Sequence, residues 1–138
     1  MGYYSQLEWN LEVPADKLEE LKSAIAEMEQ KIKKDNFRSE KERKKTENLF
    51  FYWLVDLQFE PVDDKYLLTY EEYYQKHYYD ELFVEFIWPY IAKPAEMILR
   101  GEDGITWGYY FGLDGIYELE FIKKRGRKIY DYKYGRTR

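Results

Sequence analysis

The hydrophobic pattern changes its period at Pro14, and this change limits the fold more than any other feature of the chain. Before Pro14, every second residue from position 7 to 13 is apolar; after it, apolar residues recur every three or four positions. A period of two indicates a strand with one buried face, and the longer spacing indicates one face of a helix. The two sets are Leu7, Trp9, Leu11 and Val13, and then Leu18, Leu21, Ile25, Met28 and Ile32.

The helix is expected to end near Lys34 and to pack its stripe against the buried face of the preceding strand. Acidic residues lead it and basic residues close it, which matches the helix dipole. The stripe spans only about two heptads, so packing on the protein's own sheet is favoured over a coiled coil.

The next segments predict a connection and then a strand. Residues 35–48 are charged and polar, so we expect a flexible connection there. Residues 49–59 alternate between two largely apolar sets rich in aromatic side chains, which favours a long strand. A helix remains open as the alternative, because Leu49, Trp53 and Leu57 also share a helical face.

Beyond Pro61, the pattern predicts a short element and a second helix. Residues 65–70 fit a short strand or part of a turn. Residues 71–92 look helical, and we expect either one helix ending near Ile87 or a bent pair, because Pro89 disrupts a helix interior.

The last third predicts a β-meander with glycine-containing turns at 101–104, 112–115 and 124–127. The whole order indicates a single α+β domain over residues 1–138. We expect one antiparallel or mixed sheet with two helices on one face, in a ferredoxin-like βαβ arrangement followed by the meander.

Composition excludes several classes of site and protein. The chain has 138 residues with 0 Cys and 1 His, so thiolate metal sites, disulfides and cysteine nucleophiles are ruled out. No targeting segment or membrane span is recognisable, and a cytoplasmic location is expected. Abundant Glu and Lys are typical of thermophile proteins, although AT-rich genomes also favour Lys.

The charge is unevenly distributed along the chain. The last sixteen residues, 123–138, carry +7 while the whole chain carries −5, so the rest carries −12. A second basic segment at 31–45 carries +5. This asymmetry indicates either a polyanionic or acidic partner or a solvated surface.

Tyrosine is the most unusual residue of the composition. There are 16 Tyr, more than the margin of a core this size easily uses, so some are expected in exposed patches. Tyr70, Tyr74 and Tyr78 are four residues apart and would share one face of a helix. That face would either cover the core or dock a protein partner, because Tyr is enriched at interfaces.

No catalytic constellation is recognisable. His77 lies among tyrosines with no clear nucleophile nearby, so a structural role is favoured over that of a general base. Asp63 and Asp64 are the first acidic pair to suspect for a loop-bound cation, yet adjacent loop acids usually face water. The glycines between 101 and 115 fit hairpin turns rather than a phosphate-binding loop.

Two short motifs resemble a loose group of small phage and mobile-element proteins. The opening Met1-Gly2-Tyr3-Tyr4 runs straight into the first strand. A later turn, Gly101-Glu102-Asp103-Gly104, precedes the aromatic run Trp107-Gly108-Tyr109-Tyr110-Phe111. The resemblance implies an accessory protein of a virus or prophage and assigns no activity or residue roles.

These patterns predict a non-enzymatic binding protein without a cofactor, metal or small-molecule substrate. It would act by protein–protein contact or as a homodimer through its Tyr-rich surface, with no membrane partner. The alternative is nucleic-acid binding by a basic hairpin that turns at Gly126. Its residues would be Lys123, Lys124, Arg125, Arg127, Lys128, Tyr130, Tyr132 and Tyr134.

Overall fold

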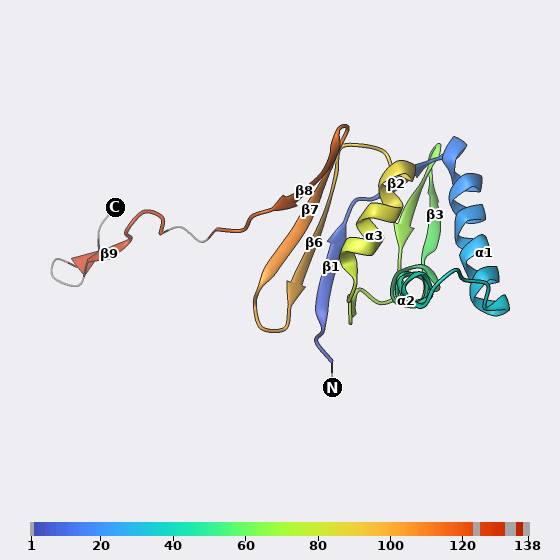
Figure 1. The fold of residues 1–138 in the computed structure, drawn as a ribbon. Helices are drawn as coiled ribbons and strands as arrows, with labels where there is room; N and C mark the ends of the chain where they lie inside the picture. The colour runs from blue at the N-terminus through green and yellow to red at the C-terminus, as the bar shows by residue number, and fades with distance from the viewer. Residues whose placement is uncertain (1, 123–124, 132–134, 137–138) are drawn as a thin grey trace.

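The computed structural model describes residues 2–122, 125–131 and 135–136 (Figure 1). The helices are α1 (Leu18–Lys34), α2 (Glu40–Leu49) and α3 (Asp80–Ile87). The strands are β1 (Ser5–Trp9), β2 (Glu12–Pro14), β3 (Gln58–Val62), β4 (Lys65–Thr69), β5 (Tyr74–Gln75), β6 (Ala95–Gly101), β7 (Thr106–Gly112), β8 (Gly115–Leu119), β9 (Tyr130–Asp131) and β10 (Gly135–Arg136). The predicted α+β class is confirmed. Within these ranges no helix is long and apolar enough to cross a membrane.

The strands form more than the single sheet that the pattern predicted. A five-stranded sheet has the order β5-β1-β6-β7-β8, and a three-stranded sheet has the order β2-β4-β3. Every pair in both sheets is antiparallel. The predicted β-meander is present in part, as β6, β7 and β8 joined by the turns at 101–104 and 112–115. Strand β9 does not continue it, because β9 pairs with β10 in a separate two-stranded sheet.

One nearly continuous stretch of chain belongs to both sheets. Only Asn10 and Leu11 separate β1 from β2. The carbonyl of Leu11 accepts a hydrogen bond from the amide of Leu68 in β4 at 2.9 Å. The side-chain oxygen of Asn10 accepts one from the amide of Glu96 in β6 at 3.0 Å. The two residues at the bend are therefore bonded to strands of different sheets.

Helix α3 covers the buried face of the five-stranded sheet. The Phe83 ring stacks on Trp9 of β1 at 5.4 Å between ring centroids. Phe83 and Ile87 of α3 and Met97 and Phe111 of the sheet are fully buried. Helix α1 lies beside β3, at the end of the molecule remote from β8 (Figure 1).

The apolar stripe predicted on α1 joins the hydrophobic core. Leu18 and Leu21 are buried, and the three later members, Ile25, Met28 and Ile32, are partly buried and packed against the core. The helix contacts α2 and the short helical turns at 50–54 and 88–90. Its stripe is therefore covered largely by other helical segments.

Replacing Leu21 with alanine should lower the free energy of unfolding by about 2–5 kcal/mol, because a fully buried leucine would leave a cavity. Chemical denaturation monitored by tryptophan fluorescence measures this loss. Ser23→Ala, on the exposed side of the same helix, is the control and should change the value by about 0.5 kcal/mol at most.

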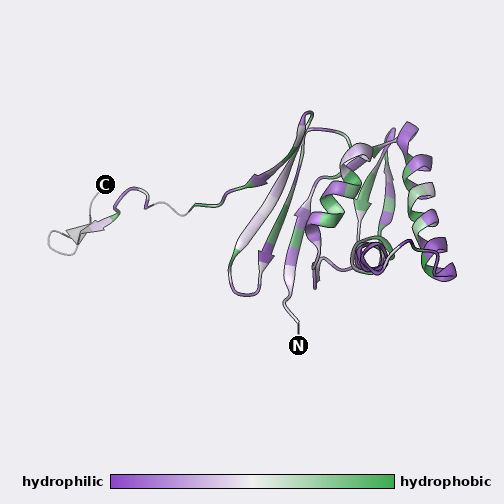
Figure 2. Ribbon diagram, in the orientation of Figure 1, coloured by the Kyte–Doolittle hydropathy of each residue, from purple (hydrophilic) through white to green (hydrophobic). Residues whose placement is uncertain are grey.

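The predicted flexible connection at 35–48 is wrong over most of its length, because α2 occupies residues 40–49. Its polar sequence carries no apolar stripe, and Figure 2 shows it as hydrophilic along most of its length. The helix is stabilised by local contacts instead. The Ser39 hydroxyl accepts a hydrogen bond from the amide of Glu42 at 3.1 Å, which caps the helix. Arg43 pairs with Glu47 one turn later at 3.2 Å.

The strand predicted at 49–59 is also wrong. Residues 50–54 continue α2 as a π-helical turn, in which the Val55 amide donates to the Phe50 carbonyl at 2.8 Å. Strand β3 begins only at Gln58. The residues buried in the core are Leu49, Phe50, Trp53, Leu54 and Leu57, and this spacing is helical.

The helix predicted over 71–92 is much shorter than expected. Residues 74 and 75 form β5, and α3 begins at Asp80 and ends at Ile87. The predicted end near Ile87 is confirmed, and a 3₁₀ turn containing Pro89 follows it. Residues 65–69 form β4, one of the two alternatives for that segment.

Candidate functional site

The three tyrosines predicted to share a helical face lie in different environments. Tyr70 follows β4 and is buried; its hydroxyl donates to the carbonyl of Trp53. Tyr74 lies on β5 and is 44% exposed. Tyr78 is half-buried in the segment before α3. The helical arrangement is wrong, and only Tyr74 and Tyr78 reach the surface.

Other tyrosines contact these two and form two groups of rings. The Tyr4 ring stacks on Tyr74 at 5.5 Å, and Tyr52 contacts Tyr78 at 5.6 Å and Tyr79 at 5.2 Å. The Tyr78 hydroxyl accepts a hydrogen bond from the backbone amide of Tyr3 at 2.7 Å. Because Tyr3 adjoins Tyr4, this bond links the two groups. We call this set, Tyr4, Tyr52, Tyr74, Tyr78 and Tyr79, the tyrosine surface.

The tyrosine surface is built from three distant parts of the chain. The N-terminal segment supplies Tyr4, the π-helical turn supplies Tyr52, and the segment from β5 to α3 supplies the other three. Tyr4, Tyr52 and Tyr79 are 38%, 39% and 45% exposed, so each ring has a dry and a wet side. Such half-buried tyrosines can contact a partner without unfolding the core beneath them.

Tyr79 has a left-handed backbone, with φ of 60°. A bulky residue pays about 1–3 kcal/mol for this conformation, which glycine or asparagine adopts more easily. It immediately precedes α3, where no side chain caps the helix. The chain therefore places an aromatic side chain at a position where a small residue would be more stable.

Sequence reasoning missed Tyr4 and Tyr52 as members of this surface, and it left Tyr79 off the predicted docking face although Tyr79 adjoins Tyr78 in the sequence. Tyr52 was assigned to a strand, although it belongs to a helical turn. Tyr4 meets Tyr74 because β1 and β5 pair with Gln6 opposite Tyr74. The alternation of β1 was a usable signal, since it puts Ser5 and Leu7 inward and Tyr4 outward.

The structure brings Ser5 and His77 together, a pair that the sequence did not indicate. The Ser5 hydroxyl lies 2.9 Å from His77 Nδ1. Ser5 is 1% exposed and His77 is 7% exposed, and the Trp53 ring lies 5.2 Å from the imidazole. A catalytic serine needs open space for a substrate carbonyl. Neither Ser5 nor His77 lines the two cavities that lie between α3 and the strands β7 and β8. The pair is a satisfied buried hydrogen bond.

The acidic pair suspected of binding a cation forms a turn. Asp63 and Asp64 connect β3 to β4, and Asp63 has a left-handed backbone with φ of 57°. In the part of the chain that the structure describes, no group of three or more His, Cys, Asp or Glu is arranged to hold a metal ion.

The C-terminal segment extends away from the rest of the molecule (Figure 1). We call residues 120–131 the basic arm. Arg125, Arg127, Lys128 and Tyr130 are exposed on it, whereas Lys123, Lys124, Tyr132 and Tyr134 lie outside the described residues. Strand β9 pairs with β10, with Tyr130 opposite Arg136, and the predicted hairpin turning at Gly126 is not formed by these paired strands.

No protein-family model, curated protein or solved structure matches this chain. The geometry of its own residues is therefore the basis for assigning a function.

Proposed function

We propose that the protein is a non-enzymatic binding protein that recognises a protein partner, or a second copy of itself, through the tyrosine surface. The observation that carries the proposal is that four exposed tyrosines and the half-buried Tyr78, from three segments of the chain, form two groups of contacting rings linked by one hydrogen bond. Tyr side chains supply large contact areas at a low cost in conformational entropy and are enriched at interface centres.

Backbone strain within the patch supports the same proposal. Tyr79 is held in a left-handed conformation next to Tyr52. Strained residues of this kind cluster at functional positions, because selection for function retains them against their cost in stability.

We also infer a ferredoxin-like arrangement beneath the surface. If β1 and β2 are taken as one bent strand, the strands lie in the order β6, β1–β2, β4, β3. Helices α1 and α2 precede the β3–β4 hairpin and α3 precedes β6, as in a split βαβ unit. Strands β5, β7 and β8 are then additions at the edges. An accessory role in a virus or prophage would fit such a small binding domain.

The double variant Tyr74→Ser/Tyr79→Asn tests the tyrosine surface. Partner capture or self-association should weaken at least about tenfold, because two of the four exposed aromatic side chains of the tyrosine surface are removed. The fold should survive, since both side chains are largely exposed and asparagine tolerates the backbone of Tyr79. Capture from a nuclease-treated cell lysate and light scattering of the purified protein measure the two forms of binding.

Tyr117→Ser is the matched control. Tyr117 is 50% exposed and lies on β8, the edge of the five-stranded sheet opposite to β5. The Tyr117→Ser variant should bind the partner, or itself, as tightly as the wild type does. Equal loss in the control and the double variant, or a wild type that neither captures protein nor self-associates, would contradict the proposal.

Nucleic-acid binding by the basic arm is the second candidate. The exposure of Arg125, Arg127 and Lys128 beside Tyr130 favours it, because bases contact phosphates and aromatic rings stack on nucleobases. A gel-shift titration with single- and double-stranded DNA and RNA at low salt tests it. No shift at about 100 μM protein, the weak end of non-specific affinities, excludes it.

A further inference from the structure

The basic arm exposes apolar side chains as well as charges. Phe121 is 44% exposed, and Ile122, Ile129 and Tyr130 are between 63% and 72% exposed. Five basic residues lie between Ile122 and Ile129 in the sequence, and the structure describes three of them, Arg125, Arg127 and Lys128. A segment that combines large exposed apolar groups with an excess of basic residues has the chemistry of an interaction surface.

A groove of complementary chemistry lies between α3 and the strands β7 and β8. Two adjoining cavities of about 330 and 260 Å³ share Glu81, Tyr109 and Glu118 in their lining. Trp107 and Tyr109 supply aromatic surface there, and both donate hydrogen bonds to Asp80, at 3.0 and 2.5 Å. The groove is therefore preformed, with an aromatic wall beside an acidic rim.

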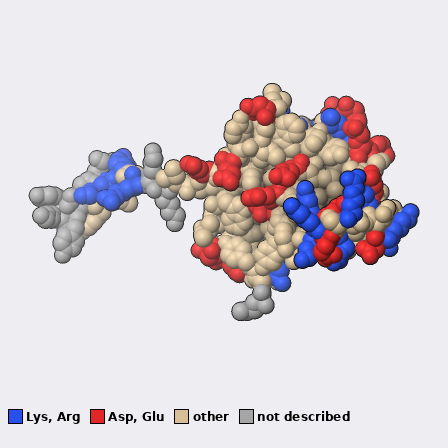
Figure 3. Space-filling view, in the orientation of Figure 1, with Lys and Arg blue, Asp and Glu red and all other residues tan. Residues whose placement is uncertain are grey.

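The charges along the groove are all of one sign. Its lining includes four carboxylates and, among the residues described, neither Lys nor Arg. The four are Asp80, Glu81, Glu85 and Glu118. In Figure 3, acidic side chains gather on the body near the point where the arm leaves it, and basic side chains gather on the arm.

We propose that the basic arm of one molecule binds in the acidic aromatic groove of a second copy, so that two chains exchange arms reciprocally. The body and the C-terminal segment carry net charges of opposite sign, −12 and +7, which favours this association. Arg and Lys can pair with the rim carboxylates and also stack on aromatic faces. Ile129 and Tyr130 would be shielded from water against the groove.

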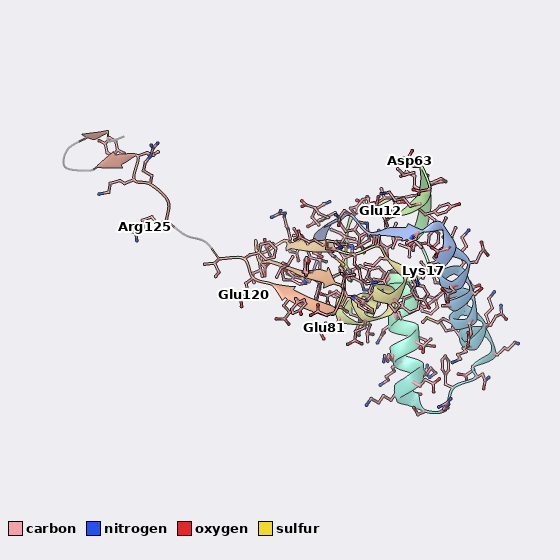
Figure 4. The ribbon with its side chains drawn as sticks, turned by 90° about the horizontal axis from the view of Figure 1, so that it is seen from above. Glu12, Lys17, Asp63, Glu81, Glu120 and Arg125 are labelled. Atoms are coloured by element: carbon pink, nitrogen blue, oxygen red, sulfur yellow. The ribbon has the colours of Figure 1, made fainter. Side chains whose placement is uncertain are left out.

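The path of the chain favours a second copy over the same molecule. Leu119, at the end of β8, itself lines the groove. For Arg125 to reach that groove in its own molecule, the chain would have to reverse direction between Leu119 and Arg125. The five intervening residues contain no Gly, Pro, Asn or Asp, the residues that favour tight turns. Figure 4 shows Arg125 well beyond Glu81 and Glu120, on an arm that points outward.

The test uses three full-length proteins in sedimentation experiments. One is the wild type, one reverses the arm (Arg125→Glu/Arg127→Glu/Lys128→Glu), and one reverses the groove (Glu81→Lys/Glu85→Lys/Glu118→Lys). Asp80 is left unchanged, because two aromatic side chains donate to it. The wild type should dimerise reversibly, and at least about tenfold more weakly at high salt, where the Debye length falls to roughly 3 Å. Circular dichroism and thermal unfolding check that each variant is folded.

Each reversed protein should be monomeric alone, and an equimolar mixture of the two should form a heterodimer. In that mixture one arm–groove pair keeps its native charges and the other has both signs exchanged. If the lysine variant does not fold, Glu81→Gln/Glu118→Gln should still weaken dimerisation at least about tenfold.

Three results would overturn the proposal. The first is a wild type that stays monomeric at all concentrations, whether or not its arm binds oligonucleotides. The second is a dimer that persists in both reversed proteins, and the third is a mixture that stays monomeric. The Tyr74→Ser/Tyr79→Asn variant should keep the arm-dependent dimer, so failure of the tyrosine surface and failure of arm exchange are distinguishable.

Discussion

Replacing Trp53 with alanine should destabilise the fold more than any other substitution considered for this protein. Trp53 is 1% exposed, and its ring stacks on Phe83 of α3 at 4.7 Å. Removing so large a buried side chain costs about 3–5 kcal/mol in the free energy of unfolding. Since small domains are stable by only about 5–15 kcal/mol, the variant should be close to unfolding at 37 °C.

Trp53 also anchors the segment from β5 to α3, which carries three members of the tyrosine surface. Its Nε1 donates to the carbonyl of Tyr78 at 2.6 Å, and its own carbonyl accepts from the Tyr70 hydroxyl. Alanine would leave the Tyr78 carbonyl without this donor, which adds about 1–3 kcal/mol if the group stays buried. Trp53→Phe keeps an aromatic ring for stacking and loses the Nε1 donor. Its free energy of unfolding should therefore lie between those of the wild type and the alanine variant.

Phe51→Ala is the control, because Phe51 belongs to the same π-helical turn but is 55% exposed. It should lower the free energy of unfolding by less than about 1 kcal/mol. Urea unfolding of the three variants at neutral pH measures the order. Equal losses for Trp53→Ala and Phe51→Ala would show that the turn is not anchored in the core.

The secondary-structure elements that were correctly predicted from the sequence are those that bury only one of their faces. In β1, β6 and α1 the core side repeats at one fixed period, so the apolar positions alone indicate the element. The turns of the meander carry glycine, and Gly104 has a positive φ that other residues adopt with difficulty.

The wrong predictions concern segments in which the buried residues do not repeat at a single period. Helix α2 has no buried stripe until Leu49, and its signals are the Ser39–Glu42 cap and the Arg43 pairs. Residues 49–57 are apolar on nearly every side, so both periods fit them and only tertiary packing decides. The tyrosine surface was missed in part for the same reason, because Tyr4 and Tyr74 meet only through strand pairing.

The contact between Ser5 and His77 also forms only through strand pairing, so the sequence pattern did not predict it. It buries His77, and this burial makes the stability of the protein depend on pH. Register places Ser5 opposite Gln75, two residues before His77, and β1 directs Ser5 into the core. Burial lowers the pKa of His77 from 6.5 to about 4, although the Ser5 backbone and Asp80 act in the opposite direction. The folded protein therefore keeps His77 neutral at pH values where the unfolded chain protonates it.

Stability should consequently fall as the pH drops from about 6.5 towards 4. In this window the unfolded chain binds a proton that the folded protein does not, so unfolding becomes easier by up to about 3 kcal/mol. Well above pH 6.5 neither state binds the proton, and His77 contributes no pH dependence. The chain has 1 His, so one imidazole signal in an NMR titration reports the folded-state pKa without ambiguity.

His77→Gln isolates this effect from the titration of carboxylates, which overlaps it below about pH 5. Glutamine retains a hydrogen-bonding group for the Ser5 hydroxyl but does not titrate. Between pH 7.5 and 5, the wild type should lose stability relative to the variant, with a slope approaching about 1.4 kcal/mol per pH unit below pH 6. Parallel curves for the two proteins, or an imidazole that titrates near pH 6.5 in the folded state, would mean that water reaches His77. In the structure His77 is only 7% exposed, and its ring lies against Ser5 and Trp53.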